Sequence, residues 1–394
     1  MKFIHAADTH LGHLFQGVKR ISTDLQEEFK ESTFNAFEVV IQTAIEQQVD
    51  FLVLAGDEYD RHKRSLKEQN FLREQFLKLQ EHEIDVFIIY GNHDYLVEES
   101  TFIEFPENVH VFGENVSTVD LQTKAGEKVA VSGFSYKQQH VFKDYVTDFP
   151  SKISDQDYHI GMYHGMPGTL SKDYAPFDIQ EMITKGYDYW ALGHIHDAGI
   201  INQNPPIVYS GDIQGLNRTE TGEKGFYLVE MKDGKTTQEF ISSQIFIWDE
   251  INAMMEPGFT IDDIKNAVVQ AAEELKPNTL ISINLDNVQC LANEVQNQIE
   301  DGEFLPYIQT YLNNQQIYAY KVKTIYRNET LFEDMDESYW DEARKDIFTR
   351  EKIIGLDKKI MSLDFIKEHV DEDNYIDEIV QKSYGVLNHK RKDN

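Results

Sequence analysis

Five short segments of this sequence combine carboxylate, imidazole and amide side chains in patterns suited to metal binding. They are Asp8-Thr9-His10, Gly56-Asp57-Glu58-Tyr59-Asp60, Gly91-Asn92-His93-Asp94, His164-Gly165 and Gly193-His194-Ile195-His196. Residues two apart in an extended segment lie on one face, so Asp8 and His10, or His194 and His196, can point the same way. Oxygen and nitrogen donors without a thiolate suit Mn²⁺, Mg²⁺, Fe²⁺ or Zn²⁺ and argue against a structural zinc cage.

Each of these segments follows a stretch that reads as a β-strand. The apolar runs are residues 3–7, 51–55, 86–90, 159–163 and 189–192. Helical spacing of apolar residues over 25–47 and 65–82 predicts helices between the first three strands. This βαβαβ order implies parallel strands with right-handed crossovers. Because the carboxyl ends of parallel strands form ligand sites, we expect the polar segments to meet at one edge of a sheet.

The pattern along the chain predicts three parts. Further short strands are predicted over residues 109–112, 129–134 and 207–210, and Asp233-Gly234 marks a hairpin between strands 226–231 and 238–241. Beyond residue 251 a helix over 260–275 and strands over 280–285 and 317–322 predict a smaller α+β domain. We therefore expect an α/β domain over residues 1–239, an α+β domain over 240–325 and a helical C-terminal segment over 326–394.

The composition limits the classes of function. The 394 residues include 37 Lys and Arg against 69 Asp and Glu, a net charge of −32, which excludes a basic protein that coats nucleic acid. Cys290 is the only cysteine, so an intrachain disulfide is excluded and a reducing, cytoplasmic location is expected. No run of about 18 apolar residues occurs, so the sequence predicts no membrane span.

The five motifs in this order resemble the calcineurin-like metallophosphoesterase superfamily. The wider context over residues 3–12, 91–94 and 191–196 resembles the SbcD-type DNA repair nucleases, and residues 209–226 resemble their YhaO-like branch. The resemblance implies a four-layer α/β/β/α metallophosphoesterase core, with residues 240–325 as a capping domain that positions DNA. It also implies a two-metal-dependent DNA phosphodiesterase that acts in DNA repair or end processing. We expect exonuclease activity first and endonuclease activity second.

The same resemblance implies roles for single residues. The first metal ion would be held by Asp8, His10, Asp57 and His196, and the second by Asp57, Asn92, His164 and His194. Two divalent ions, with Mn²⁺ expected first and Mg²⁺, Fe²⁺ or Zn²⁺ as alternatives, would polarise a phosphoryl oxygen and activate a water. His93 would stabilise the transition state or protonate the leaving oxygen, and Asp60 would support His93.

A basic run, Arg61-His62-Lys63-Arg64, directly follows the second motif. We expect Arg61, Lys63 and Arg64 to contact DNA phosphates, because cations at the start of a helix oppose its dipole and suggest another purpose. A nuclease with a net charge of −32 must meet DNA through such a patch or through a partner. Alone, it should bind DNA weakly and lose that binding readily with salt.

The resemblance also implies partners. Resemblance to the SbcD-type nucleases implies a homodimer that forms through helices of the core domain. It also implies a coiled-coil ATPase partner of the SbcC type that docks on the C-terminal segment. The main alternative is a small-molecule or nucleotide phosphoesterase, or a Ser/Thr-type protein phosphatase, with the same bimetal site, because residues 56–61 also resemble the G-D-x-x-D-R motif of those phosphatases. Asp94 in place of their glutamate, and the region after residue 240, favour the nuclease. A non-catalytic scaffold is disfavoured by the complete set of ligand types.

Overall fold

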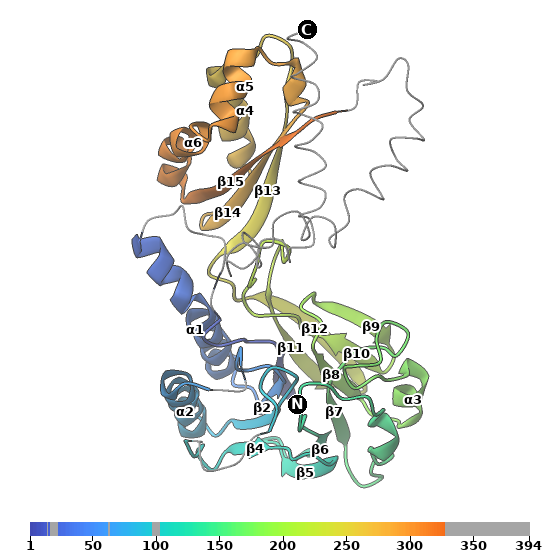
Figure 1. Cartoon of the computed structure of the whole chain (residues 1–394). Helices are drawn as coiled ribbons and strands as arrows, with labels where there is room; N and C mark the ends of the chain where they lie inside the picture. The colour runs from blue at the N-terminus through green and yellow to red at the C-terminus, as the bar shows by residue number, and fades with distance from the viewer. Residues whose placement is uncertain (14, 16–22, 62–63, 97–102, 328–394) are drawn as a thin grey trace, which may run out of the picture. The chain divides into compact units, whose positions relative to one another are not determined.

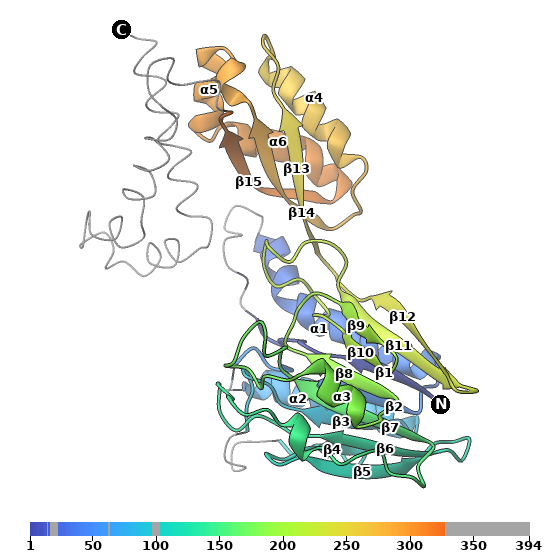
Figure 2. The same ribbon diagram turned by 90° about the vertical axis from the view of Figure 1, so that its right-hand side faces the viewer.

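The computed structural model describes residues 1–13, 15, 23–61, 64–96 and 103–327, traced in Figures 1 and 2. The chain divides into two compact units, one of residues 1–249 with 278–280 and one of residues 250–277 with those from 281 onward. The first unit therefore continues ten residues beyond the predicted boundary at 239, because that boundary falls inside a paired strand. Most of the predicted helical segment 326–394 lies outside the described residues.

The first unit is a sandwich of two six-stranded sheets. The first sheet has the order β12-β11-β1-β2-β3-β4. Its strands are β1 (Lys2–Ala6), β2 (Phe51–Ala55), β3 (Asp85–Ile89), β4 (Val109–Val111), β11 (Gly225–Lys232) and β12 (Lys235–Ser242). Strands β1 to β4 are mutually parallel and β11 is antiparallel to β1. The turn between β11 and β12 is Asp233-Gly234, as predicted, with both residues at positive φ.

Two helices, α1 (Thr23–Glu46) and α2 (Leu66–Glu81), cover the outer face of this sheet. Their buried stripes, which include Phe37 on α1 and Phe76 on α2, pack on the apolar side chains of β1 to β3. Ser65 caps α2 through a capping box with Glu68, which fixes where the helix starts after the second motif. The predicted βαβαβ opening is therefore confirmed.

The second sheet has the order β5-β6-β7-β8-β10-β9. Its strands are β5 (Ser117–Gln122), β6 (Lys128–Gly133), β7 (Tyr158–His164), β8 (Tyr189–Gly193), β9 (Gly199–Gln203) and β10 (Pro206–Tyr209). Its inner face, with Val131 and Met162, packs on Phe87 and Ile89 of the first sheet. The helix α3 (Ile179–Thr184) and the short 3-10 turn η2 (Val146–Asp148) lie against the outer face, on the cluster that contains Trp190. The predicted α/β/β/α layering is therefore confirmed.

The second unit is built on a three-stranded sheet of order β13-β14-β15. Its elements are β13 (Ile247–Met254), α4 (Ile261–Ala272), β14 (Thr279–Asp286), η3 (Val288–Cys290), α5 (Asn293–Glu300), α6 (Phe304–Leu312), η4 (Asn313–Gln315) and β15 (Ile317–Ile325). Thr260 caps α4 through a capping box with Asp263. The α+β composition matches the prediction, and the capping role stays a prediction.

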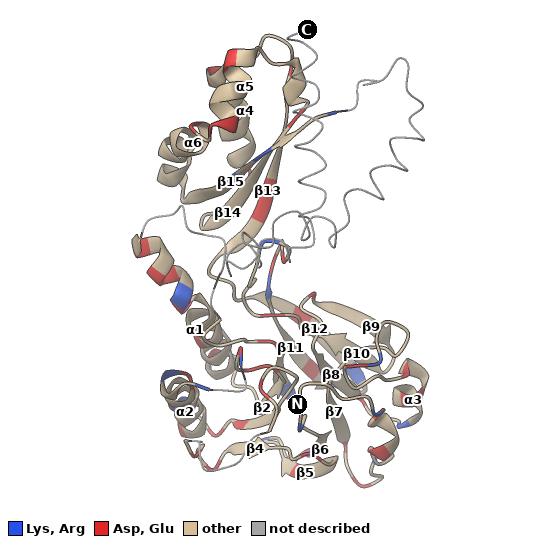
Figure 3. Ribbon diagram, in the orientation of Figure 1, with Lys and Arg blue, Asp and Glu red and all other residues tan. Residues whose placement is uncertain are grey.

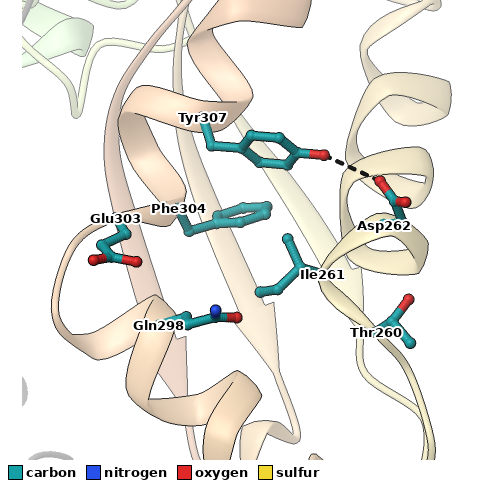
Figure 4. A pocket seen from close by; sticks show the side chains of 7 residues that line it. All are labelled: Thr260, Ile261, Asp262, Gln298, Glu303, Phe304 and Tyr307. Carbon is teal, nitrogen blue, oxygen red and sulfur yellow. Dashed lines mark hydrogen bonds between the residues drawn. The ribbon is translucent and has the colours of Figure 1, made fainter.

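A hollow of about 580 Å³ lies in this second unit, where the start of α4 meets α6. Figure 4 shows Tyr307 pointing across it, with its hydroxyl donating to Asp262 Oδ1 at 3.0 Å. Its lining combines Phe304 and Ile261 with carboxylates and contains no histidine or cysteine, so it is unsuited to the expected chemistry. Acidic residues occur on helices of both units (Figure 3). Within the part of the chain that the structure describes, no helix has the length and apolarity to span a bilayer.

The buried His5 on β1 is expected to make the first unit sensitive to acid. Burial, against a hydrogen bond to the Leu192 carbonyl, lowers the pKa of His5 from 6.5 to about 3. His5 binds a proton below pH 6.5 in the unfolded chain but only below about pH 3 in the folded chain. The free energy of unfolding therefore falls as the pH drops from 6.5 to about 3. In His5→Gln the free energy of unfolding should fall less steeply with decreasing pH, by about 1 kcal/mol per pH unit. Urea unfolding of both proteins between pH 4 and 7 measures the two slopes. Identical pH slopes for the two proteins would contradict the prediction.

Candidate metal centre

Four of the residues proposed as metal ligands have left-handed backbone conformations. Asp8, His10, Asp57 and His194 have φ values of 48°, 41°, 58° and 99°. Such values are uncommon for residues other than glycine, and strained residues cluster at functional sites. All four lie in loops directly after β1, β2 and β8, and the turns aim their side chains at the same edge of the sandwich.

The first group of potential ligands consists of Asp8, His10 and His196, whose ligand atoms all lie within 4.8 Å of one another. His10 Nε2 and His196 Nε2 are 3.3 Å apart, so these two nitrogens converge on one point. The carboxylate of Asp8 is fully buried and accepts the backbone N–H of His194 at 3.0 Å. This hydrogen bond links the loop after β1 to the loop after β8, across the two sheets.

The second group consists of Asp57, His164 and His194, again with ligand atoms within 4.8 Å of one another. Asn92 joins it, because its Oδ1 lies 3.0 Å from His164 Nε2 and 2.9 Å from His194 Nδ1. Asp57 Oδ2 is 3.4 Å from His164 Nε2 and 3.9 Å from His10 Nε2, so Asp57 lies between the two groups. The structure thus brings together all seven residues for which a ligand role was predicted.

The charges of this edge fit divalent cations. Burial opposes a charge on His164, yet the neighbouring Asp57 carboxylate raises the pKa of His164 to about 9. Burial likewise opposes a charge on His196, but Glu220 and Asp8 raise the pKa of His196 to about 10. Burial and the charge of His164 lower the pKa of His194 to about 3, which keeps its nitrogen free to coordinate. The buried carboxylates at this edge thus favour positive charge, and divalent ions would supply that charge in place of the protons on His164 and His196.

Gly91 is needed because of a close approach rather than a turn. A Cβ atom at this position would lie 2.3 Å from Asp57 Oδ1 and 2.6 Å from His164 Nε2. No side chain fits there without displacing two potential ligands. The glycine before Asn92 in the third motif is thereby explained.

His93 is exposed and lies beside the two groups rather than within them. Its ring meets the ring of His10 edge-on, with centroids 4.8 Å apart. The predicted role of Asp60 has to be corrected. It is the Asp60 backbone carbonyl that lies 3.0 Å from His93 Nδ1, whereas the Asp60 carboxylate is 2.6 Å from His13 Nδ1 and 3.6 Å from His10 Nδ1. Asp60 therefore orients His93 through its main chain and supports His10 and His13 through its side chain.

Asp94 holds the loops together. It is fully buried, and its carboxylate accepts the backbone N–H groups of Gly91 at 2.8 Å, Glu58 at 2.8 Å and Tyr59 at 3.3 Å. These bonds fix the loop after β2 against the loop after β3. Asp94 is thus structural, which is why the third motif ends in a short acidic residue.

The basic run does not act as one patch. Arg64 is partly buried, its guanidinium lying 4.6 Å from the Tyr59 ring and 4.0 Å from the Tyr90 ring and donating to the Asp94 carbonyl. These contacts make Arg64 a structural residue, contrary to the expectation that it binds phosphate. Arg61 is 61% exposed, with Nε 3.4 Å from Asp60 Oδ2, and remains available to a ligand. Lys63 lies outside the described residues.

The sequence interpretation missed a cluster behind His196, in the segment between β10 and β11. Glu220 Oε1 accepts from His196 Nδ1 at 2.9 Å, and Asp212, also near His196, is fully buried. Lys224 Nζ donates to the His196 carbonyl at 3.1 Å and lies 3.2 Å from Asp212 Oδ1. Lys224 thus already supplies a cation next to Asp212. Carboxylates behind ligating histidines fix the tautomer and orientation of the ring.

Glu220→Gln is expected to weaken metal binding about 10- to 100-fold. The Glu220 carboxylate accepts from His196 Nδ1–H and so keeps Nε2 of that ring available to the ion, and the substitution removes this charge. Isothermal titration of metal-stripped protein with Mn²⁺ would measure the effect. Glu38→Gln, which removes an exposed carboxylate from α1, serves as the matched control and should bind like the wild type. Equal affinities for all three proteins would show that Glu220 does not position His196.

Two packed sheets with carboxylates and imidazoles gathered at their strand ends are the arrangement expected of a metal-dependent phosphoester hydrolase. Comparison with known proteins agrees: a family model described as calcineurin-like phosphoesterase matches residues 1–198, half of the chain. The protein belongs to the calcineurin-like phosphoesterase family, whose members hydrolyse phosphoester bonds.

Two curated relatives share this part of the chain. The uncharacterized metallophosphoesterase YhaO of Bacillus subtilis is 39% identical over 254 residues, which are 64% of this chain and 62% of that protein. The DNA double-strand break repair protein Mre11 of Methanocaldococcus jannaschii is 28% identical over 244 residues, 58% of this chain and 62% of that protein. The chain thus matches less than two thirds of the length of either relative. A solved dimetal phosphatase from Danio rerio aligns with a TM-score of only 0.38 at 11% identity, over 62% of this chain and 96% of that one, and supports no argument.

Proposed function

We propose that this protein is a two-metal-dependent DNA phosphodiesterase that acts in DNA repair or DNA end processing, as an exonuclease and also as an endonuclease. The observation that carries the proposal is the convergence of the seven potential ligands, with His93 beside them, at one edge of the core. The proposal for DNA in particular is supported by the relative named as a double-strand break repair protein, which aligns with 58% of the chain.

In this proposal Asp8, His10, Asp57 and His196 hold one ion, and Asp57, Asn92, His164 and His194 hold the other. When bound, the ions, Mn²⁺ first among the candidates, would neutralise phosphate charge and lower the pKa of an attacking water. The chain itself orients these groups: Asp57 is fixed by the His93 N–H at 2.9 Å, and His164 by the Ala55 carbonyl at 2.9 Å from Nδ1. In the proposed mechanism His93, which is exposed beside the two ligand groups, would give a proton to the departing oxygen.

The proposed partners follow from the same assignment. We propose DNA as the substrate, a homodimer as the working form and a coiled-coil ATPase of the SbcC type as a partner, with the cytoplasm as the location. The net charge of −32 supports a partner, because this chain alone repels DNA at long range. Arg61 remains the candidate phosphate contact among the described residues of the basic run.

One assay tests the function. The protein with Mn²⁺ is incubated separately with linear duplex DNA, single-stranded DNA, bis-p-nitrophenyl phosphate and p-nitrophenyl phosphate. The proposal expects hydrolysis of DNA and of the diester. Hydrolysis confined to the monoester would overturn the nuclease assignment in favour of a small-molecule or protein phosphatase. DNA degradation that survives His93→Ala would reveal a contaminating nuclease.

A further inference from the structure

A row of aromatic rings leads outward from the metal edge. The ring of Tyr174 lies 4.5 Å from that of His194, measured between centroids. His140 lies 5.5 Å from Tyr174, and Phe142 lies 6.5 Å from His140. Phe142 is 65% exposed and His140 is exposed as well, so the row changes from partly buried at the metal edge to open at its far end. We call these three residues, Tyr174, His140 and Phe142, the aromatic ledge.

The two loops that carry the ledge are held in place. Val141 is buried and pairs with Tyr174 as an isolated parallel bridge. The Val141 N–H donates to the Asp173 carbonyl at 2.9 Å, and the Ala175 N–H donates to the Val141 carbonyl at 2.6 Å. The Met166 N–H donates to the Tyr174 carbonyl at 3.2 Å, which ties the ledge to the loop that follows β7. The backbone that carries the exposed rings is therefore preorganised, which lowers the entropic cost of binding a flat partner.

Exposed lysines accompany the rings on the same two loops. Lys137 pairs with Glu114, Lys143 pairs with Asp148, and Lys172 is exposed. Exposed ion pairs contribute little to stability, so a phosphate can compete for these lysines. Flat rings with cations beside them are the combination that binds single-stranded nucleic acid without sequence preference.

We propose that the aromatic ledge binds unpaired nucleobases by stacking, so that the substrate is a single strand or the separated end of a duplex. Bases inside a duplex are stacked on each other and have no free face, whereas an unpaired base can cover Phe142 or His140. The contact between Tyr174 and His194 then places the adjoining phosphate at the metal edge. This inference rests on the proposed nuclease function and specifies which DNA that site accepts.

The test compares binding with and without bases. Affinities are measured by fluorescence anisotropy with Mn²⁺, in a His93→Ala background that should slow cleavage about 10²- to 10⁴-fold, for a short oligothymidylate and for an abasic oligonucleotide of the same length. Phe142→Ala should weaken binding of the oligothymidylate about tenfold and leave binding of the abasic strand unchanged. Phe142→Trp should restore it. Ile201→Ala, which removes an exposed apolar side chain from β9, is the matched control.

The outcomes separate this inference from the proposed function. If Phe142→Ala weakens binding of the oligothymidylate and of the abasic strand equally, or weakens neither, the proposal that the aromatic ledge stacks on bases is overturned. Loss of self-association in Phe142→Ala with unchanged DNA affinity would overturn it in favour of a protein interface. If binding depends on the bases but the wild-type protein with Mn²⁺ cleaves no DNA, the aromatic ledge stands as a binding site and the proposed nuclease function is overturned.

Discussion

Asp57→Asn should abolish phosphodiester hydrolysis and cut the number of bound metal ions. Asp57 lies between the two ligand groups, buried, with Oδ2 3.4 Å from His164 Nε2 and 3.9 Å from His10 Nε2. Burial opposes its ionisation, but His164, His10 and His93 together hold the pKa of Asp57 well below its usual range. Asparagine keeps the size and tolerates the left-handed backbone, so the variant should fold while it loses the charge. Losing several kcal/mol of transition-state stabilisation lowers the rate by about 10³-fold or more.

The measurements are metal content after equilibration with Mn²⁺ and turnover of bis-p-nitrophenyl phosphate. Asp85→Asn is the matched control, because Asp85 begins β3 at the opposite end of the strand from the metal loops. A variant at Asp57 that binds two ions per chain and retains wild-type turnover would remove Asp57 from the centre. Binding of one ion would still agree with a residue shared by both groups.

His93→Ala should lower turnover by about 10²- to 10⁴-fold while metal content stays at the wild-type level. His93 is exposed, and only its backbone N–H, which alanine retains, touches a proposed ligand through a hydrogen bond, at 2.9 Å to Asp57 Oδ1. If the imidazole protonates the leaving oxygen, the loss must depend on the leaving group. It should be large for DNA, whose alkoxide leaves poorly, and smaller for p-nitrophenolate, which leaves without a proton.

The comparison of leaving groups distinguishes catalysis from positioning. Equal losses on DNA and on bis-p-nitrophenyl phosphate would mean that His93 stabilises charge rather than donates a proton. Reduced metal content in the variant would mean that it acts through His10, whose ring it meets at 4.8 Å. His110→Ala, which removes a half-buried imidazole from β4, controls for the loss of a histidine as such.

The positions of the seven potential ligands were predictable because each depends on local sequence. Every one ends or follows an apolar run. Parallel pairing brings the ends of β1, β2 and β3 to one edge of the first sheet, and parallel pairing brings the ends of β7 and β8 to one edge of the second. The hairpin at Asp233-Gly234 and the cap at Ser65 were predictable for the same reason, since a few adjacent residues determine them. That these side chains bind metal stays a prediction.

The errors concern side chains whose direction depends on distant residues. Arg64 is held by Tyr59 and Tyr90, which lie in the segments that follow β2 and β3, so its place in a basic run gave no indication of its contacts. The Asp60 carboxylate meets His13, which lies in the loop after β1 and is 47 residues away along the chain. Glu220 lies in a connection without periodicity, and only its acidic character in a segment that follows the last histidine motif could have suggested a role.

The strands β5 and β9 were missed for a different reason. Both lie at the edges of the second sheet, where one side of the strand faces solvent and an apolar run is not required. The helices α5 and α6 span eight and nine residues, which is too short for a helical period to be established from the sequence. Neither omission affects the metal edge, because no potential ligand lies on these elements.

The potential ligands come from both layers of the sandwich: Asp8, Asp57 and Asn92 follow strands of the first sheet, and His164 and His194 belong to the second. A pair of metal ions bound by residues of both sheets would link the two layers. The free energy of metal binding would then add to the free energy of unfolding. Metal supply would then govern how many enzyme molecules persist in a cell, and not only how fast each one works. Cells deprived of the metal would lose this protein to proteolysis instead of storing it in an idle form.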